Sequence, residues 1–114
     1  MQVIEKNKGD IAIITLEGNM VGSCEADILH NEVRSLLDRN TSKIVLDMKD
    51  VHWMGSLCIG ALMREIIIVR QNNGDVHLAS LSEKVLRLFK ITKLEGIVNI
   101  YPTVNDAVDG FIRH

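Results

Sequence analysis

The sequence is poor in aromatic residues, in cysteine and in basic charge. Aromatic residues make up 4% of the chain, and its formal net charge is −2 with a pI near 6.0. This composition offers neither the stacking platforms nor the positive surface typical of nucleic-acid binding. The two cysteines, Cys24 and Cys58, form neither a metal-binding spacing nor a disulfide framework. We therefore expect no metal, no cofactor and no nucleic-acid partner.

No apolar run is long enough to span a membrane, and the segment Met1–Lys6 lacks the pattern of a secretory signal. The chain does contain enough apolar residues, 46% of its 114 residues, to bury one core. The sequence therefore predicts a soluble, cytoplasmic protein. We expect a single domain over residues 1–114 that does not insert directly into a membrane.

Strand and helix patterns alternate along the chain. Two short strands that flank turn-forming residues predict a hairpin over 2–6 and 11–16, and later strands are expected at 44–48, 76–79 and 97–101. Amphipathic helices, the first and third of them capped by Ser23 and Ser82, are expected at 23–38, 57–71, 82–89 and from 103 onward. This order predicts an α/β fold with a mixed, mostly parallel sheet of four to five strands and about four helices.

Ser56 is the first candidate for chemistry, because it lies between a buried strand and an apolar helix. A phosphate on its hydroxyl would place roughly −1.5 to −2 charges at a helix N-terminus, where the helix dipole tolerates them. The same position suits an ordinary N-cap, which contributes about 1 kcal/mol of stability. The spacing alone leaves both interpretations open.

The helix expected at 57–71 has apolar residues on two sides. The side expected to face the core carries Cys58, Leu62, Ile66 and Val69, and the outward side carries Leu57, Ala61, Arg64 and Ile68. Apolar residues beside an exposed arginine are typical of a protein–protein interface. The alternative is that another element of the chain covers them. The apolar helix also allows weak homo-oligomers.

No motif assembles a catalytic group. Gly55-Ser56-Leu57-Cys58 breaks the G-x-S-x-G pattern of a hydrolase nucleophile. The histidines lack the spacing of a metal pair and are expected to be solvated or capping residues, namely His30, His52, His77 and His114. Trp53 is expected to be a lid over the sheet edge or an exposed anchor for a partner. We expect the protein not to be an enzyme.

The segment Ile44–Leu62 resembles the STAS domain of bacterial anti-sigma factor antagonists, in which a strand ending in leucine and aspartate leads to an aspartate–serine pair, small residues and a leucine-rich helix. Three later segments look like later elements of that family, in the same order and spacing: Asn73–Ser82, Leu88–Leu94 and Ile100–Ala107. The resemblance covers essentially the whole chain and implies a STAS-like fold.

The resemblance implies a non-catalytic regulator that acts by partner switching. In such proteins the unphosphorylated antagonist binds an anti-sigma factor, a serine kinase of the histidine-kinase-like ATPase fold, and so releases the sigma factor. The kinase phosphorylates a serine whose place Ser56 occupies, and a phosphatase reverses the modification. The loop Asn19–Gly22 should lie near Ser56, because loops that follow parallel strands cluster at one sheet edge. The implied partner-binding residues are Met20, Val21, Gly55, Ser56, Leu57, Ala61, Arg64 and Ile68.

Four positions depart from the family pattern. Gly55 and Val21 stand where the family has aspartates, and Leu57 and Cys58 replace a small hydroxyl residue and a glycine. The two missing carboxylates favour an alternative function. In it, the domain is a constitutive scaffold of a sensory assembly or a soluble subunit of a membrane lipid transporter. A third possibility, a phosphoryl-accepting or hydrolytic enzyme, predicts turnover that depends on Ser56.

Overall fold

The chain folds around a five-stranded mixed sheet, and the computed structural model describes residues 1–112. Strands β1 (Gln2–Lys8) and β2 (Ile11–Glu17) form an antiparallel hairpin. The remaining strands run parallel to β2 in the order β1-β2-β3-β4-β5, with β3 at Lys43–Asp50, β4 at Asp75–Ala79 and β5 at Asn99–Tyr101. This arrangement confirms the predicted α/β fold with a mostly parallel sheet.

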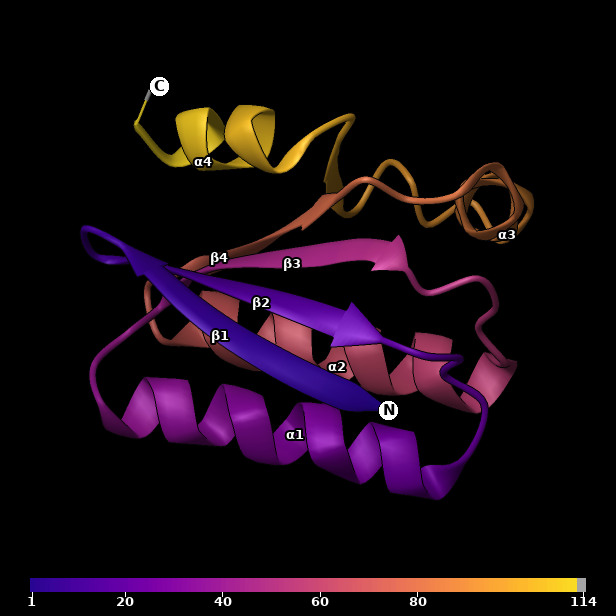
Figure 1. Ribbon diagram of the computed structural model, residues 1–114, viewed down its shortest axis with the longest axis horizontal. Helices are drawn as coiled ribbons and strands as arrows, with labels where there is room; N and C mark the ends of the chain where they lie inside the picture. Colours follow the sequence, from indigo (N-terminus) through magenta and orange to yellow (C-terminus); the bar gives the residue numbers. More distant parts are fainter. Residues whose placement is uncertain (113–114) are drawn as a thin grey trace.

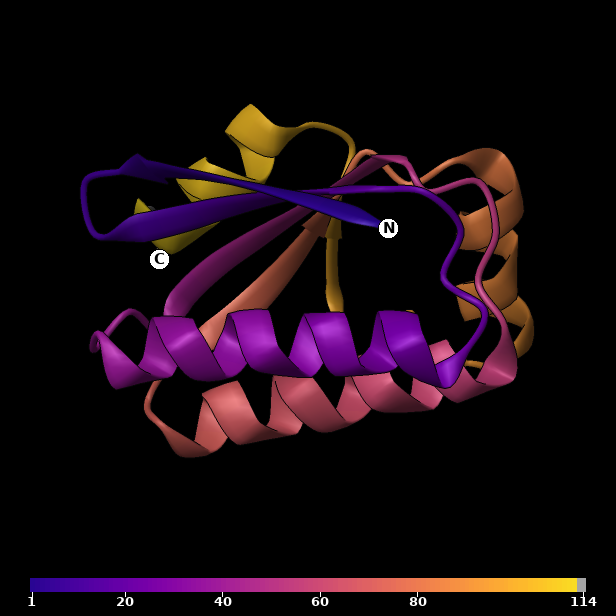
Figure 2. The same cartoon turned by 60° about the horizontal axis from the view of Figure 1, so that its bottom comes forward.

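Within residues 1–112, four helices accompany the sheet (Figure 1). Helices α1 (Ser23–Asp38) and α2 (Ser56–Gln71) pack side by side on one face, as Figure 2 shows from below. Helix α4 (Val104–Ile112) lies on the opposite face, and α3 (Glu83–Ile91) lies beyond the carboxyl end of β3. Both α1 and α2 therefore begin at the same edge of the sheet, where β2 and β3 end.

Each face of the sheet has its own apolar core. The larger core lies between the sheet and helices α1, α2 and α3, and includes Leu46, Leu62 and Phe89, each at most 1% exposed. The smaller core lies under α4 and includes Val45 and Phe111. Full burial of one such side chain contributes about 1.5–3 kcal/mol. Because β3 supplies residues to both cores, its continuous apolar run is covered on both faces, as predicted.

Helix boundaries follow the sequence signals with small differences. Helix α1 has Gly22 rather than Ser23 as its N-cap, and α3 extends two residues past the expected end at Phe89. Helix α2 ends at Gln71, as predicted, and a Cβ atom at Gly74 would collide with the Ser42 carbonyl oxygen. Strand β5 is shorter than expected.

His77 contradicts the expectation that the histidines are solvated or capping residues, and His114 lies outside the described residues. His77 is 4% exposed and stacks on Phe111, with ring centroids 3.7 Å apart. Its Nδ1 lies 2.9 Å from the Ala107 carbonyl oxygen, so this nitrogen carries the proton and donates. His77 is thus a core residue that joins β4 to α4.

Candidate functional site

The loops that follow β2 and β3 lie side by side and are joined by backbone hydrogen bonds. The amide of Met20 donates to the Trp53 carbonyl oxygen at 3.0 Å, and the amide of Gly55 donates to the Met20 carbonyl oxygen at 2.8 Å. Both views of the fold show these loops running together to the N-terminal ends of α1 and α2 (Figures 1 and 2). The predicted proximity of the loop Asn19–Gly22 to Ser56 is confirmed.

Ser56 is the first residue of α2 and not its cap. The N-cap is Gly55, which has an extended backbone and whose carbonyl oxygen accepts the first helical hydrogen bond, from the Ile59 amide at 3.0 Å. No side chain caps this helix start, and Ser56 is exposed. The interpretation of Ser56 as an ordinary N-cap is therefore wrong. Its hydroxyl stands at a positive helix terminus without a structural task there.

Three large apolar side chains stand near Ser56 with much of their surface exposed. Val21, from the loop after β2, is 52% exposed, and Leu57, the next residue in the chain, is 51% exposed. Trp53, from the loop after β3, is 40% exposed, and the Lys84 Nζ of α3 lies 5.5 Å from its ring centroid. We call Val21, Trp53, Gly55, Ser56 and Leu57 the Ser56 surface. Its members come from the two joined loops and the start of α2, and a cation of α3 lies over the Trp53 ring.

Two residues predicted to contact a partner are buried instead. Met20 is 0% exposed, because its backbone bridges the two loops and its side chain enters the larger core. Ala61 is 4% exposed, because α1 packs against the side of α2 that carries it. Neither can contact a partner in this fold. The exposed face of α2 is therefore rotated away from α1, toward Leu57, Gly60, Arg64 and Ile67, with Ile68 half-buried.

A buried carboxylate marks the α1–α2 contact. Glu65 of α2 is 1% exposed, and its Oε1 lies 3.0 Å from the Nδ1 of His30 on α1. The Nε of Arg64 lies 3.6 Å from Oε2 of the same carboxylate, while the Arg64 side chain is 65% exposed. Glu65 thus ties α1 to α2 and holds a cation close to the exposed face of α2. Helical periodicity of α2 alone contains no sign of this contact.

Cys58 lies two residues after Ser56 in the first turn of α2 and is buried. Its Sγ donates to the Gly22 carbonyl oxygen at 3.4 Å. Burial raises the pKa of the Cys58 thiol, and the nearby Glu25 carboxylate adds to the effect. A thiol held in its protonated form is a poor nucleophile, which agrees with the expectation that Cys58 is inert.

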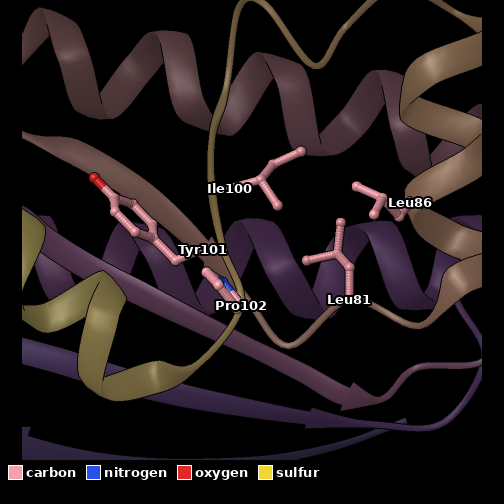
Figure 3. A pocket seen from close by; sticks show the side chains of 5 residues that line it. All are labelled: Leu81, Leu86, Ile100, Tyr101 and Pro102. Atoms are coloured by element: carbon pink, nitrogen blue, oxygen red, sulfur yellow. The ribbon is translucent and has the colours of Figure 1, made fainter.

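A separate apolar hollow of about 260 Å³ lies between β5 with the residue after it and α3 with the loop before it. Figure 3 shows Leu81, Leu86 and Ile100 pointing toward one another, while Tyr101 points away from them. Its lining offers no charged side chain. Within residues 1–112, no group of three or more histidine, cysteine or carboxylate side chains is placed to hold a metal ion. In the same part of the chain, no helix is long and apolar enough to cross a membrane.

The fold agrees with the comparisons with known proteins. The model of the STAS domain matches residues 2–107, and the chain belongs to the STAS domain family. The anti-sigma-B factor antagonist of Bacillus subtilis is 28% identical over 100 residues, which cover 85% of this chain and 86% of that protein.

Solved structures share the fold over nearly the whole chain. A Thermotoga maritima protein with the provisional name of anti-sigma factor antagonist superposes with a TM-score of 0.89 at 26% identity, covering 97% of this chain and 95% of that one. The phosphorylated form of the Bacillus cell fate determinant SpoIIAA superposes with a TM-score of 0.72 at 13% identity, covering 96% and 99% of the two chains. At that identity the second likeness concerns the fold alone.

Proposed function

We propose that this protein is a cytoplasmic anti-sigma factor antagonist that acts by partner switching. The single observation that carries the proposal is Ser56, an exposed serine at an uncapped helix start, surrounded by apolar residues that are themselves half exposed. The name of the Bacillus subtilis relative supports the choice of partner, an anti-sigma factor. The contact would combine the Ser56 surface with Arg64 and Ile68 of α2.

Phosphorylation of Ser56 would control this contact. The Ser56 Oγ would attack the γ-phosphorus of ATP held by a serine kinase of the histidine-kinase-like ATPase class. A new O–P bond forms, ADP leaves with the electrons of the broken bond, and the hydroxyl proton passes to a base of the kinase. The product carries roughly −1.5 to −2 charges amid apolar contact residues, which would favour dissociation. A phosphatase would restore the hydroxyl by hydrolysis.

The electrostatics of α2 make Arg64 the charged member of the interface. Its guanidinium is exposed but stays near the buried Glu65 carboxylate, so it presents a positioned cation rather than a wholly mobile one. Reversing this charge should abolish an interface that places an acidic group opposite it. Because Arg64→Glu also places a second carboxylate beside the buried Glu65, its free energy of unfolding is compared with that of wild type before binding is compared.

The test is an affinity purification from the native cell with tagged wild type, Arg64→Glu and Arg34→Glu. Arg34 is an exposed arginine of α1 and serves as the matched control. We expect wild type and Arg34→Glu to retain a histidine-kinase-like ATPase and Arg64→Glu to lose it. Mass spectrometry of the wild-type peptide that spans Ser56 should detect phosphate. Equal retention by all three variants would contradict the proposed interface.

One observation favours a second candidate function, that of a constitutive scaffold or transporter subunit. No carboxylate stands at positions 55 or 21, so the groups that would orient a hydroxyl or a kinase backbone in the family pattern are absent there. This candidate predicts that the purification recovers sensory or transporter subunits, that no phosphate is found, and that substitutions of Ser56 do not affect the complex.

A further inference from the structure

One side chain of α1 holds the loop that borders the Ser56 surface. The Oε1 atom of Glu25 accepts hydrogen bonds from the Gly22 amide at 3.0 Å and from the Val21 amide at 3.4 Å. Both amides precede the helix and have no acceptor within it, so the carboxylate supplies the hydrogen-bond acceptor that they need. These two amides hold the pKa of the Glu25 carboxyl below its ordinary value, because hydrogen bonds donated to a carboxylate favour its charged form.

The same short loop is fixed to α2 on its other side. Gly55 donates to the Met20 carbonyl oxygen, and Cys58 donates to the Gly22 carbonyl oxygen, so the residues on both sides of Val21 are anchored. A Cβ atom at Gly55 would lie 3.3 Å from the Val21 carbonyl oxygen and 3.4 Å from Val21 Cγ1. Val21 therefore lies directly against Gly55, one residue before Ser56, while half of its surface faces solvent.

We propose that Glu25 is a positioning residue for the Ser56 surface. It clamps the loop Asn19–Gly22 so that Val21 stands as a fixed apolar contact beside Gly55 and Ser56. The partner that fits this arrangement presents an apolar hollow to Val21. A partner matched to the family pattern, with an aspartate at this position, would present a cation instead. This inference rests on the proposed function for its partner, whereas the clamp itself can be tested on the isolated protein.

The clamp depends on hydrogen-bond acceptance, and two substitutions separate that role from charge. Glu25→Gln keeps a carbonyl oxygen that can accept from both amides, whereas Glu25→Ala removes the acceptor. The matched control is Glu83→Gln, at the first residue of α3, where the Ser82 hydroxyl already supplies the cap. Each variant should fold, because none of these side chains belongs to the apolar cores.

Hydrogen exchange followed by NMR tests whether Glu25 holds the loop Asn19–Gly22 in place. The Gly55 amide should exchange at least about tenfold faster in Glu25→Ala than in wild type, because the loop that accepts its hydrogen bond loosens. Glu25→Gln should restore most of the protection, and Glu83→Gln should leave it unchanged. Unchanged exchange of the Gly55 amide in Glu25→Ala would overturn the clamp.

A pH titration tests whether Glu25 is the group that holds this loop. Because the pKa of Glu25 is lowered in the folded protein, its stabilising effect is present above the ordinary glutamate pKa and is lost as the pH falls through the folded value. The Val21 and Gly22 amide resonances should shift together over that acidic range in wild type. Neither should show this step in Glu25→Gln. A step that persists in that variant would contradict the assignment.

The partner provides the second part of the test, with the ATPase captured by wild type as the probe. Glu25→Ala and Val21→Ala should each weaken binding at least about fivefold, and the double variant should be scarcely weaker than either, since both remove the same contact. Wild-type affinity in both single variants would overturn the role of the clamp in recognition. If wild type captures no such ATPase while the exchange and titration results hold, only the proposed function fails.

Discussion

The starts of α2 and α3 use the same type of residue in opposite ways. At α3, Ser82 is the N-cap, and its hydroxyl accepts a hydrogen bond from the Val85 amide at 3.2 Å. At α2, the N-cap is Gly55, and Ser56 falls one position later, where its exposed hydroxyl makes no cap. One position along the chain thus decides whether a serine stabilises a helix or remains available to another protein.

The surroundings of the two serines also differ, in how far the serine and the apolar residues near it are buried. Ser82 is half-buried at the base of a helix whose inward residues, Val85 and Phe89, are fully buried. Ser56 is exposed between the half-exposed side chains of Val21 and Leu57. Apolar side chains left in contact with water add no burial to the fold, and a group of them is typical of an interaction site. The comparison therefore favours a structural serine at α3 and a functional one at α2.

The largest effect should come from placing a negative charge at each serine. Ser56→Asp should weaken binding of the captured ATPase at least about tenfold, because a carboxylate then lies amid apolar contacts. Ser82→Asp should bind as wild type does, since aspartate is also a good N-cap. Isothermal calorimetry with both variants measures the difference. Equal affinities would remove the functional distinction between the two helix starts.

Stability should show the reverse ranking. Ser82→Ala should lower the free energy of unfolding by about 1 kcal/mol, because the Val85 amide loses its acceptor. Ser56→Ala should change it by less than about 0.5 kcal/mol, as expected of an exposed side chain with no cap to lose. Urea denaturation of both variants checks this. A cost at Ser56 equal to that at Ser82 would return Ser56 to a capping role.

Much of the fold could be predicted from the sequence because its signals are local. The Asn72-Asn73-Gly74 stop of α2 and the apolar run of β3 each reflect the backbone or burial of that segment alone. The start of α1 shows the limit. The pattern Gly22-x-x-Glu25 contains a capping glutamate, whereas the prediction placed the cap at Ser23.

The candidate site was predicted less completely. The residues that were predicted wrongly are buried by packing between elements that are distant in the sequence. Ala61 lies only slightly off the axis of the outward face of α2, and a helical wheel cannot show that α1 covers that side. Met20 reads as an exposed loop residue, but its backbone bridges two loops that are more than thirty positions apart in the chain. The contact of Trp53 with Lys84 likewise joins the loop after β3 to helix α3. No periodicity within one segment encodes such contacts.

The smallest predicted effect concerns the contact that joins the two helix starts. Trp53 is the sole tryptophan of the chain, so its fluorescence reports on this contact alone. Lys84→Met keeps an unbranched apolar side chain but removes the cation, and it should cost about 0.5 kcal/mol at this exposed site.

Quenching of the Trp53 fluorescence distinguishes the effect of a nearby positive charge from the effect of solvent access to the ring. Iodide is attracted by a nearby cation, so iodide quenching of Trp53 should fall in Lys84→Met, while quenching by neutral acrylamide should hardly change. Lys90→Met, at an exposed position of the same helix, should alter neither. If iodide quenching is the same in all three proteins, Lys84 does not stand over Trp53 in solution. The first turn of α3 would then contribute no charge to the margin of the Ser56 surface, and the two helix starts would act independently.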